Sequence, residues 1–434
     1  MLERETIAAL EEALNKLDCH FASLPPIGGA GASACQMSSV LAEVAARLGD
    51  NFPYFHPLYA GQMLKPPHPV ARAAYALATW INPNNHALDG GRASTAMERE
   101  AVAQIAAMFG WETHLGHLTG GGTMANLEAL WVAGQLSPGK KIVASAQSHY
   151  THQRISGVLR LPFDRVPTDT RGRLDANALE RMLAAGNVGC VVATLGTTAT
   201  GSVDPVPEIL ELRKRYEFRL HVDAAYGGYF TLAENLARET RAAFDRILEA
   251  DSIVIDPHKH GLQPYGCGCV LFRDPAVGAL YKHDSPATYF SSRDLHLGEI
   301  SLECSRPGAA AVALWATMRL LPLIRGGEFA RGLEASRRAA LNLYGRLAAD
   351  RRVVTAFAPE LDIVVWAPRG AGASACQQIF ENAARRNLHL ALARLPGAFF
   401  GIPDDEVLAL RSVLMKPDHE EWMDRIWEIL DASL

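Results

Sequence analysis

Short apolar runs alternate with helical stretches through the middle of this chain of 434 residues. The runs that we predict as strands are KIVASA (141–146), GCVVATLG (189–196), RLHVDAAY (219–226), DSIVIDP (251–257) and CGCVLFRD (267–274). Strands that are apolar on both faces are typical of a largely parallel sheet that helices cover on both sides. The sequence therefore predicts an α/β fold with a mainly parallel central sheet in a large domain.

The segments on either side of this alternation have other patterns. The first 82 residues (1–82) contain two predicted helices and a proline-rich stretch, so we expect an arm that packs on another surface. Residues 83–320 are predicted to form the large domain, and residues 321–434 a small α+β domain. For the second half we expect a long helical section, three strands and a final helix, at 309–349, 362–368, 398–403, 406–417 and 419–434.

The composition is that of an ordinary globular protein, with 49% hydrophobic and 21% charged residues and a formal net charge of −5. No basic cluster indicates nucleic acid, and no run approaches the roughly 18 apolar residues that cross a bilayer. The N-terminus is charged and amphipathic, unlike a secretory signal, and the 7 scattered cysteines are typical of reduced thiols. We expect a cytoplasmic protein with no nucleic-acid or membrane partner.

Two of the predicted strands carry ionisable side chains at their ends. Asp223 ends the run RLHVD, and Lys259 follows the run SIVI. A carboxylate buried at a strand end must be paired or protonated, because an uncompensated buried charge is costly. An amine that forms a Schiff base, together with a carboxylate that keeps a pyridine nitrogen protonated, suits pyridoxal 5'-phosphate. The alternative for each residue is a structural ion pair, including one with the other.

A glycine-rich segment is the second candidate part of the site. The predicted order is a helix, a loop with the sequence GHLTGGGT and a further helix, at 96–109, 116–123 and 124–135. Gly121 and Gly122 let the backbone approach a ligand closely, and free N–H groups at the start of a helix bind phosphate. Thr123 either caps the helix or donates to the phosphate. The alternative is a glycine-rich turn with a threonine cap.

Further polar residues follow the same set of strands. His149 lies just beyond the strand 141–146, where an imidazole can stack on a flat aromatic ligand. The alternative for His149 is a helix-capping or solvated histidine. His152, nearby, is expected to be a helix-capping or solvated histidine. Thr198 lies at the end of another strand, where it can hydrogen-bond a phenolic oxygen or a carboxylate. His258 precedes the lysine and is either a phosphate neighbour or a capped side chain.

A metal site is the alternative interpretation of two of the cysteines. Cys267 and Cys269 lie near His258 and His260 in the sequence. Structural zinc sites usually show a C-x₂₋₄-C spacing, whereas C-x-C on a strand places two residues on one face. We therefore expect no metal.

Several motifs together resemble one enzyme family. They are TGGGTMAN (119–126), ATLGTT (193–198), HVDAAYGG (221–228) and DPHK-x-x-LQPYGCGC (256–269). Through them the chain resembles the group II pyridoxal phosphate-dependent amino acid decarboxylases, which include aromatic amino acid, tyrosine/aspartate, glutamate and histidine decarboxylases. The similarity runs from about residue 50 to 430. It implies the fold type I architecture of pyridoxal phosphate-dependent transferases and a homodimer with shared active sites.

The resemblance also assigns roles to residues of this chain. It implies that Lys259 bonds the cofactor and that Asp223 pairs with the pyridinium nitrogen. Ala225 would pack under the ring, and His149 would stack on it. The residues implied to lie at the phosphate are Gly121, Gly122, Thr123, His258 and, reaching into the site of the other subunit, Ser305 in an S-R-P-G stretch.

Two departures from the family pattern bear on the reaction. His260 follows the lysine where many members carry tryptophan. The segment 281–303 stands where aromatic members carry a longer loop whose tyrosine protonates Cα, and we assign that role to Tyr289. Its neighbour Phe290 is the alternative occupant of this position. In related enzymes phenylalanine there accompanies oxidative deamination to an aldehyde.

The resemblance implies decarboxylation of an L-amino acid to the amine and CO₂ through an external aldimine and a quinonoid. The S-R-P-G stretch also resembles sphingosine phosphate lyases, so a C–C lyase or an aldehyde synthase on the same scaffold is the alternative. An aminotransferase is disfavoured, because the C-terminal domain of this chain shows no convincing carboxylate-binding arginine motif. Arg411 is the nearest candidate. The intact Lys259 and Asp223 disfavour a non-catalytic cofactor-binding protein. The absence of a G-x-G-x-x-G turn disfavours a dinucleotide-binding protein.

The substrate is expected to be a small-molecule amino acid, with aromatic side chains favoured. By resemblance to the N-terminal substrate layer of the family, Tyr59, His56 and Arg92 are predicted to wall the pocket. Aromatic residues suit an aromatic side chain, whereas Arg92 equally suits a distal carboxylate.

Overall fold

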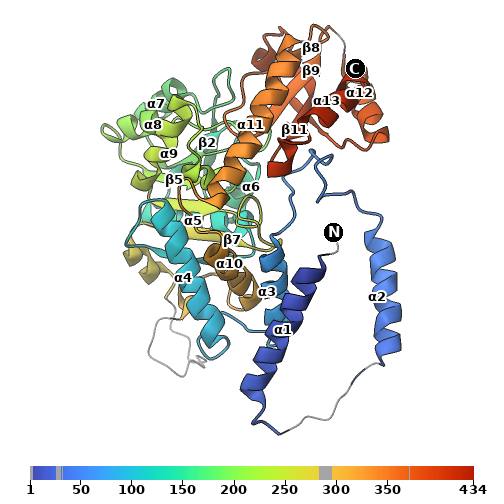
Figure 1. Ribbon diagram of the computed structural model, residues 1–434. Coiled ribbons are helices and arrows are strands. Elements are labelled where there is room, and N and C mark those ends of the chain that lie inside the picture. The colour runs from blue at the N-terminus through green and yellow to red at the C-terminus, as the bar shows by residue number, and fades with distance from the viewer. Residues whose placement is uncertain (1–2, 26–30, 32, 283–295, 371) are drawn as a thin grey trace.

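The computed structural model describes residues 3–25, 31, 33–282, 296–370 and 372–434. Figure 1 shows a large layered body, a smaller C-terminal unit in orange to red above it, and N-terminal helices in blue beside it. No helix in the described ranges combines the length and the apolar character that a membrane span requires.

A 7-stranded sheet forms the centre of the large body. In spatial order its strands are β1 (Leu115–Thr119), β7 (Gly268–Phe272), β6 (Ser252–Ile255), β5 (Arg219–Asp223), β4 (Val188–Thr194), β2 (Lys141–Ser145) and β3 (Phe163–Val166). β7 runs antiparallel to both of its neighbours, and the strands from β6 to β3 run parallel to one another. The predicted α/β fold with a mainly parallel sheet is confirmed.

Helices cover both faces of this sheet. They are α3 (Pro69–Thr79), α4 (Arg92–Met108), α5 (Gly122–Leu136), α6 (Thr151–Val158), α7 (Ala176–Ala184), α8 (Val206–Arg213), α9 (Arg238–Asp245) and α10 (Gly308–Leu320). Val254 of β6 belongs to the same apolar core as Ala129 of α5. Its neighbours Ile253 and Ile255 point to the other face, into the core that includes α4. Because both faces are buried, the strands are apolar throughout.

The C-terminal unit is a four-stranded antiparallel sheet with helices against it. Its elements are α11 (Glu328–Ala349), β8 (Val353–Thr355), β9 (Ile363–Pro368), α12 (Ala373–Arg385), β10 (Ala391–Pro396), β11 (Glu406–Val413) and α13 (Met423–Asp431), with the strands in the order β10-β11-β9-β8. Trp366 of β9 is fully buried in the core that these helices close. The predicted α+β character is confirmed, and the domain boundaries at 82 and 320 stay predictions.

The N-terminal segment packs on the large body only in part. α1 (Arg4–Phe21) lies along α3, which in turn packs against α10. α2 (Ala34–Leu48) stands apart from the rest of the chain in Figure 1, and every one of its residues is exposed. The N-terminal arm thus has an outer helix with no core of its own.

Three sequence expectations for the elements were wrong. The predicted loop 116–123 begins inside a strand, because β1 pairs with β7 along Leu115–Thr119. The predicted strand 398–403 is instead a 3₁₀ turn that ends at Gly401, whose φ of 64° is left-handed. The helical section 309–349 is interrupted after Leu320, where Pro322 and two glycines follow.

A buried ion pair fastens the large body near the S-R-P-G stretch. Arg306 lies 2.6 Å from Glu98 of α4, and both side chains are almost fully buried. Arg306 also donates to the carbonyl oxygens of Leu118 and Asn85. Glu98 in turn accepts hydrogen bonds from the Leu118 N–H and the Asn85 side chain. The pair therefore joins α4 and β1 to the segments that contain Asn85 and Arg306.

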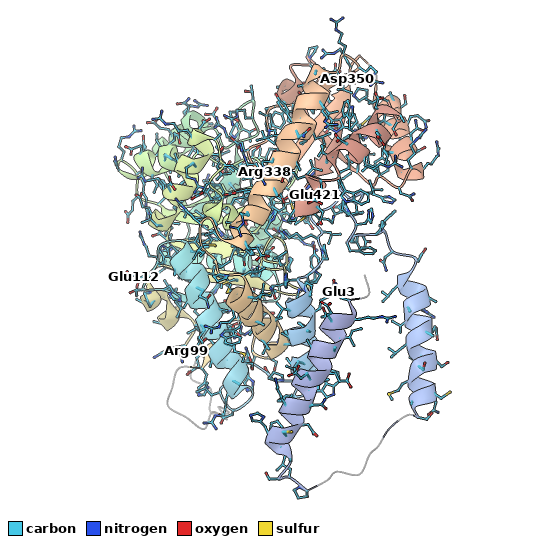
Figure 2. All side chains as sticks on the ribbon, in the orientation of Figure 1. Glu3, Arg99, Glu112, Arg338, Asp350 and Glu421 are labelled. Carbon is cyan, nitrogen blue, oxygen red and sulfur yellow. The ribbon has the colours of Figure 1, made fainter. Side chains whose placement is uncertain are left out.

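We expect Arg306→Leu to lower the free energy of unfolding by about 3–5 kcal/mol, because Glu98 would remain buried without its cation. Arg338→Leu is the matched control. Arg338 lies on α11 (Figure 2) and pairs with Glu420, and both side chains are substantially exposed. That variant should change stability by about 0–1 kcal/mol. The measurement is urea unfolding followed by tryptophan fluorescence. Equal effects of the two substitutions would contradict a structural role for the buried pair.

Candidate active site

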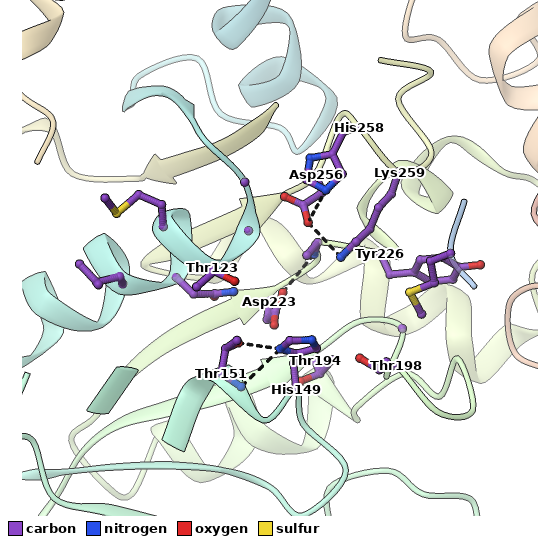
Figure 3. A pocket seen from close by; sticks show the side chains of 18 of the residues that line it. Thr123, His149, Thr151, Thr194, Thr198, Asp223, Tyr226, Asp256, His258 and Lys259 are labelled. Atoms are coloured by element: carbon purple, nitrogen blue, oxygen red, sulfur yellow. Dashed lines mark hydrogen bonds and ion pairs between the residues drawn. The ribbon is translucent and has the colours of Figure 1, made fainter. Parts of the chain in front are cut away.

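A cavity of about 560 Å³ opens at the carboxyl ends of the central parallel strands. Thr194 ends β4, Asp223 ends β5, and Asp256 follows β6. The cavity is lined by Met63, Gly120, Gly121, Gly122, Thr123, Met124, Asn126, Leu127, His149, Thr151, Thr194, Gly196, Thr198, Asp223, Ala225, Tyr226, Asp256, His258 and Lys259 (Figure 3). Ligands of open α/β sheets bind at this edge, because polar loops and helix N-termini meet there.

Asp223 is held ionised at the bottom of this cavity. Asp223 is only 4% exposed, and its Oδ2 lies 2.8 Å from Nε2 of His152. Its Oδ1 accepts the N–H of Ala225. Burial alone would raise the pKa of Asp223, but the hydrogen bond and charge of His152, with the charge of Lys259, hold it well below its usual value.

Lys259 has a different carboxylate partner. Its Nζ lies 2.9 Å from Oδ2 of Asp256, three residues earlier in the same turn. Figure 3 shows this pair on one side of Asp223 and His149 on the other. Lys259 and Asp223 therefore do not pair with each other, and the amine of Lys259 and the carboxylate of Asp223 both face the cavity. The ion pair between them that the sequence left open is not formed.

The glycine loop needs its glycines for close approaches. Gly121 adopts a φ of 147°, which L side chains rarely adopt. A Cβ at Gly122 would lie 2.7 Å from Oδ2 of Asp256, and a Cβ at Gly268 would lie 2.5 Å from the carbonyl carbon of Gly121. α5 begins at Gly122 with no side-chain cap, and Thr123 is exposed towards the cavity. The capping role considered for Thr123 is thus not used.

His149 is half-buried at the far wall of the cavity. Its Nδ1 accepts the backbone N–H of Thr151 at 3.3 Å and lies 2.7 Å from the Thr151 hydroxyl. Because Nδ1 accepts, the ring proton is assigned to Nε2. Burial lowers the pKa of His149. Thr198 lines the same cavity, beyond the end of β4.

His258 faces the loop from the other side. Its Nδ1–H donates to the carbonyl oxygen of Cys267 at 2.7 Å, and burial lowers its pKa. Ala225 contributes to the cavity wall beside Asp223. Burial raises the pKa of the Cys267 thiol well above its usual value. Within the described ranges, no three His, Cys, Asp or Glu side chains come together to hold a metal ion.

Several predicted site residues lie elsewhere in this chain. Tyr59 is buried beneath Lys416 of the C-terminal unit, and His56 packs edge-on against Trp422. Arg92 is exposed at the start of α4. Ser305 is exposed and accepts a hydrogen bond from Asn84. None of these four lines the cavity, so their roles stay predictions, and Tyr289 lies outside the described residues.

Sequence reasoning did not single out some of the residues that the cavity contains. Asp256 was missed, although it follows the apolar run SIVI just as Asp223 ends RLHVD. Thr194, whose buried hydroxyl has no partner among the described residues, was also missed. His152 was expected to be capping or solvated, and this was wrong, because it is fully buried against Asp223.

These residues fit pyridoxal 5'-phosphate. The loop and the start of α5 offer backbone N–H groups to a phosphate, and Lys259 offers an amine to an aldehyde. Asp223 offers an ionised carboxylate that a protonated pyridine nitrogen would neutralise. Asp256 Oδ1 and Thr194 Oγ1 are buried acceptors or donors without a partner in the described part of the chain, as expected where a polar ligand completes the bonding.

We expect Gly122→Ala to raise the dissociation constant of pyridoxal phosphate about tenfold or more, equivalent to about 1.4 kcal/mol. The new Cβ displaces Asp256, which then no longer holds Lys259 in place. Gly157→Ala in α6 is the control, because a Cβ there meets nothing within 4 Å. Cofactor titration followed by absorbance measures both. Unchanged affinity in Gly122→Ala would show that the close approach is not required.

Comparison with known proteins agrees with this geometry. Residues 53–367 match the Pyridoxal-dependent decarboxylase conserved domain. An L-tyrosine decarboxylase from Enterococcus faecium is 29% identical, with coverage of 66% of this chain and 64% of that protein. A probable L-tyrosine/L-aspartate decarboxylase from Methanothermobacter thermautotrophicus is 30% identical over 291 residues, covering 66% and 74%. The chain thus spans less than two thirds of the length of the first of these relatives.

Solved structures share the fold. Oryza sativa TDC with PLP and tryptamine superposes with a TM-score of 0.80 at 19% identity, over 100% of this chain and 98% of that one. Mouse CSAD gives a TM-score of 0.79 at 20% identity, over 98% and 91%. At these identities the likeness concerns the fold alone. With the domain match over most of its length and the cavity that fits the cofactor, this chain belongs to the pyridoxal-dependent decarboxylase family.

Proposed function

We propose that this chain removes the carboxyl group of an L-amino acid, preferably an aromatic one, to give the amine and CO₂. The observation that carries the proposal is the cavity in which Lys259 and the ionised Asp223 face the same space with separate partners. The names of the relatives, which are tyrosine and tyrosine/aspartate decarboxylases, support the aromatic preference.

The polar residues and glycines that line the cavity have different proposed tasks. Bound pyridoxal phosphate supplies an electron sink for the bond that breaks. Lys259 holds the cofactor and later releases the product, and Asp256 pairs with its amine at 2.9 Å. Asp223 keeps the ring nitrogen protonated, a charge that is in place before the reaction. Gly121, Gly122, Thr123 and His258 surround the phosphate, and Ala225 lies under the ring.

A proton must return to the substrate Cα after CO₂ leaves. His149 carries its ring proton on Nε2, since Nδ1 accepts from Thr151. Together with Thr198, it is proposed to orient the substrate against the ring. Tyr289 remains the second proposed donor, and Phe290 in that position would favour the aldehyde product.

We also propose that two copies of the chain build each active site. Ser305 is exposed and lies outside its own cavity, as expected of a residue that serves the other subunit. Arg92 is also exposed and lies in the same region. Two residues further on, Ser94 donates to Asn85, and the adjacent Asn84 donates to Ser305. Tyr59 and His56 precede Met63, which does line the cavity, and are proposed to extend the substrate wall.

The outer helix α2 supports this assembly. Met37, Val40, Leu41, Val44 and Leu48 recur at helical spacing and are all between 44% and 65% exposed. Such an apolar stripe in water is unfavourable, and a second copy of the chain is the partner proposed to cover it.

The first test is a screen of L-amino acids with the purified holoenzyme. We expect CO₂ and the corresponding amine in equal amounts, fastest with L-tyrosine, L-tryptophan or L-phenylalanine. Lys259→Ala is the control and should lose both the turnover and the visible absorption that borohydride removes from the wild type. Ammonia and peroxide with an aldehyde product would identify an aldehyde synthase instead, and an unchanged spectrum in Lys259→Ala would refute the role of Lys259.

The second test addresses the shared site. Ser305→Ala and Lys259→Ala are each expected to have low activity alone. If Ser305 serves the other subunit, a mixed dimer of the two contains one site with no substitution, so mixing should raise activity above that of both parents. If Ser305 acts within its own chain, every site keeps one substitution and mixing should restore nothing.

A further inference from the structure

His152 is a buried imidazole whose described polar contact is the carboxylate of Asp223. It lies in the first turn of α6, is fully buried, and places Nε2 2.8 Å from Oδ2 of Asp223. Because the carboxylate is ionised and only accepts, Nε2–H is the donor. The two residues are 71 positions apart in the sequence, so the fold brings them together.

The other ring nitrogen of His152 has no hydrogen-bond partner among the described residues. Burying a polar atom without a partner costs stability, which an apolar side chain in the same place would avoid. The neighbouring His221 does not share the bond, since its nitrogens pair with Asn126 and Ser252. In the described part of the chain, the bond to Asp223 is thus the one side-chain hydrogen bond of His152, which places any further role of this imidazole at Asp223.

A second buried pair in the molecule shows what a purely structural arrangement looks like. His117 lies 2.9 Å from Glu128, and both are as deeply buried as His152 and Asp223. There the other nitrogen of the imidazole bonds the Leu118 carbonyl, and Glu128 also accepts from Tyr281. Every polar group is satisfied, and neither residue lines the cavity.

We propose that His152 is a positioning residue which, by donating from Nε2 to Asp223, keeps the shared proton on the ring nitrogen of bound pyridoxal phosphate. Asp223 and the ring nitrogen compete for one proton, and it resides on the more basic of the two. The bond from His152 stabilises the ionised carboxylate and so makes it the weaker base. The same bond fixes Oδ2 while the Ala225 N–H holds Oδ1, so the carboxylate cannot rotate.

The inference rests on the proposed binding of the cofactor ring beside Asp223. Through Asp223, His152 would set how strongly the ring withdraws electrons, although His152 itself would touch neither cofactor nor substrate. Groups that orient a ligand-binding side chain in this way typically change affinity or activity by about 10–100-fold when they are removed.

The test uses holoenzyme loaded with pyridoxal phosphate that is ¹⁵N-labelled at the ring nitrogen, and reads the ¹⁵N chemical shift. The wild type should show a protonated ring. His152→Leu should move the shift towards that of a neutral pyridine and weaken cofactor binding about 10–100-fold. His152→Gln, whose Nε2 can take the place of the imidazole Nε2, should keep the wild-type shift, and the shorter His152→Asn should not.

Two controls separate this effect from a loss of packing. His117→Leu removes an equally buried pair outside the cavity, and should lower stability while leaving the ring protonated. In an Asp223→Asn background, His152→Leu should add no further change in the shift, because the residue it acts through is already neutral. If His152→Leu does not fold, the comparison of the Gln and Asn variants decides the question.

The outcomes are separable from those of the proposed function. A wild-type shift in both His152→Leu and His152→Asn, or an unprotonated ring in the wild type, would overturn the inference even if CO₂ is released. A protonated ring that depends on His152 in a protein that releases no CO₂ would support the inference and refute the proposed decarboxylation.

Discussion

The ionised carboxylate of Asp223, buried at the carboxyl edge of the sheet, is the constraint on which the site depends. Burial opposes its charge, so partners must surround it, and His152 and the Ala225 N–H supply them. Because Asp223 has these partners, Lys259 is left to a second carboxylate, Asp256. The cavity thus holds an amine and a separate acid instead of one closed ion pair. This division is what the proposed cofactor would use, since its aldehyde and its pyridine nitrogen lie at opposite ends of the ring.

Sequence reasoning reached much of this because strand ends carry a local signal. Apolar runs predicted the central strands, and polar residues after them identified Asp223, Lys259 and His149. β1 was missed because LGHLT contains a glycine and a histidine and reads as a loop; its strand character comes from β7, and His117 is satisfied by Glu128. His152 was misjudged because its partner, too, comes from a distant part of the sequence. Its partner is 71 positions away, so no pattern around residue 152 could reveal that it is buried and paired.

The outer helix of the N-terminal segment differs from the other helices in the described part of the chain, because every one of its residues is exposed. α1 packs on α3, but α2 exposes an apolar stripe that resembles half of an interface. The network of Arg306, Glu98 and Asn85 fixes the backbone next to Ser305 while leaving that serine exposed. This fixed and exposed position is consistent with the proposed role of Ser305 at the site of a second copy. The sequence could indicate the arm through its lack of strand alternation, but not the surface it covers.

The strand β7 begins between the glycine loop and the turn that carries Lys259, the two parts proposed to hold the phosphate and the aldehyde of the cofactor. Gly268 touches the backbone of Gly121 so closely that no side chain fits between them. One residue earlier, the carbonyl of Cys267 accepts both the N–H and the imidazole of His258, next to Lys259. The glycine loop and the lysine turn are therefore fastened to the same two residues, and the distance between them is set before any ligand arrives. A ligand that places its anion at the loop and its aldehyde at the lysine must therefore match that fixed separation.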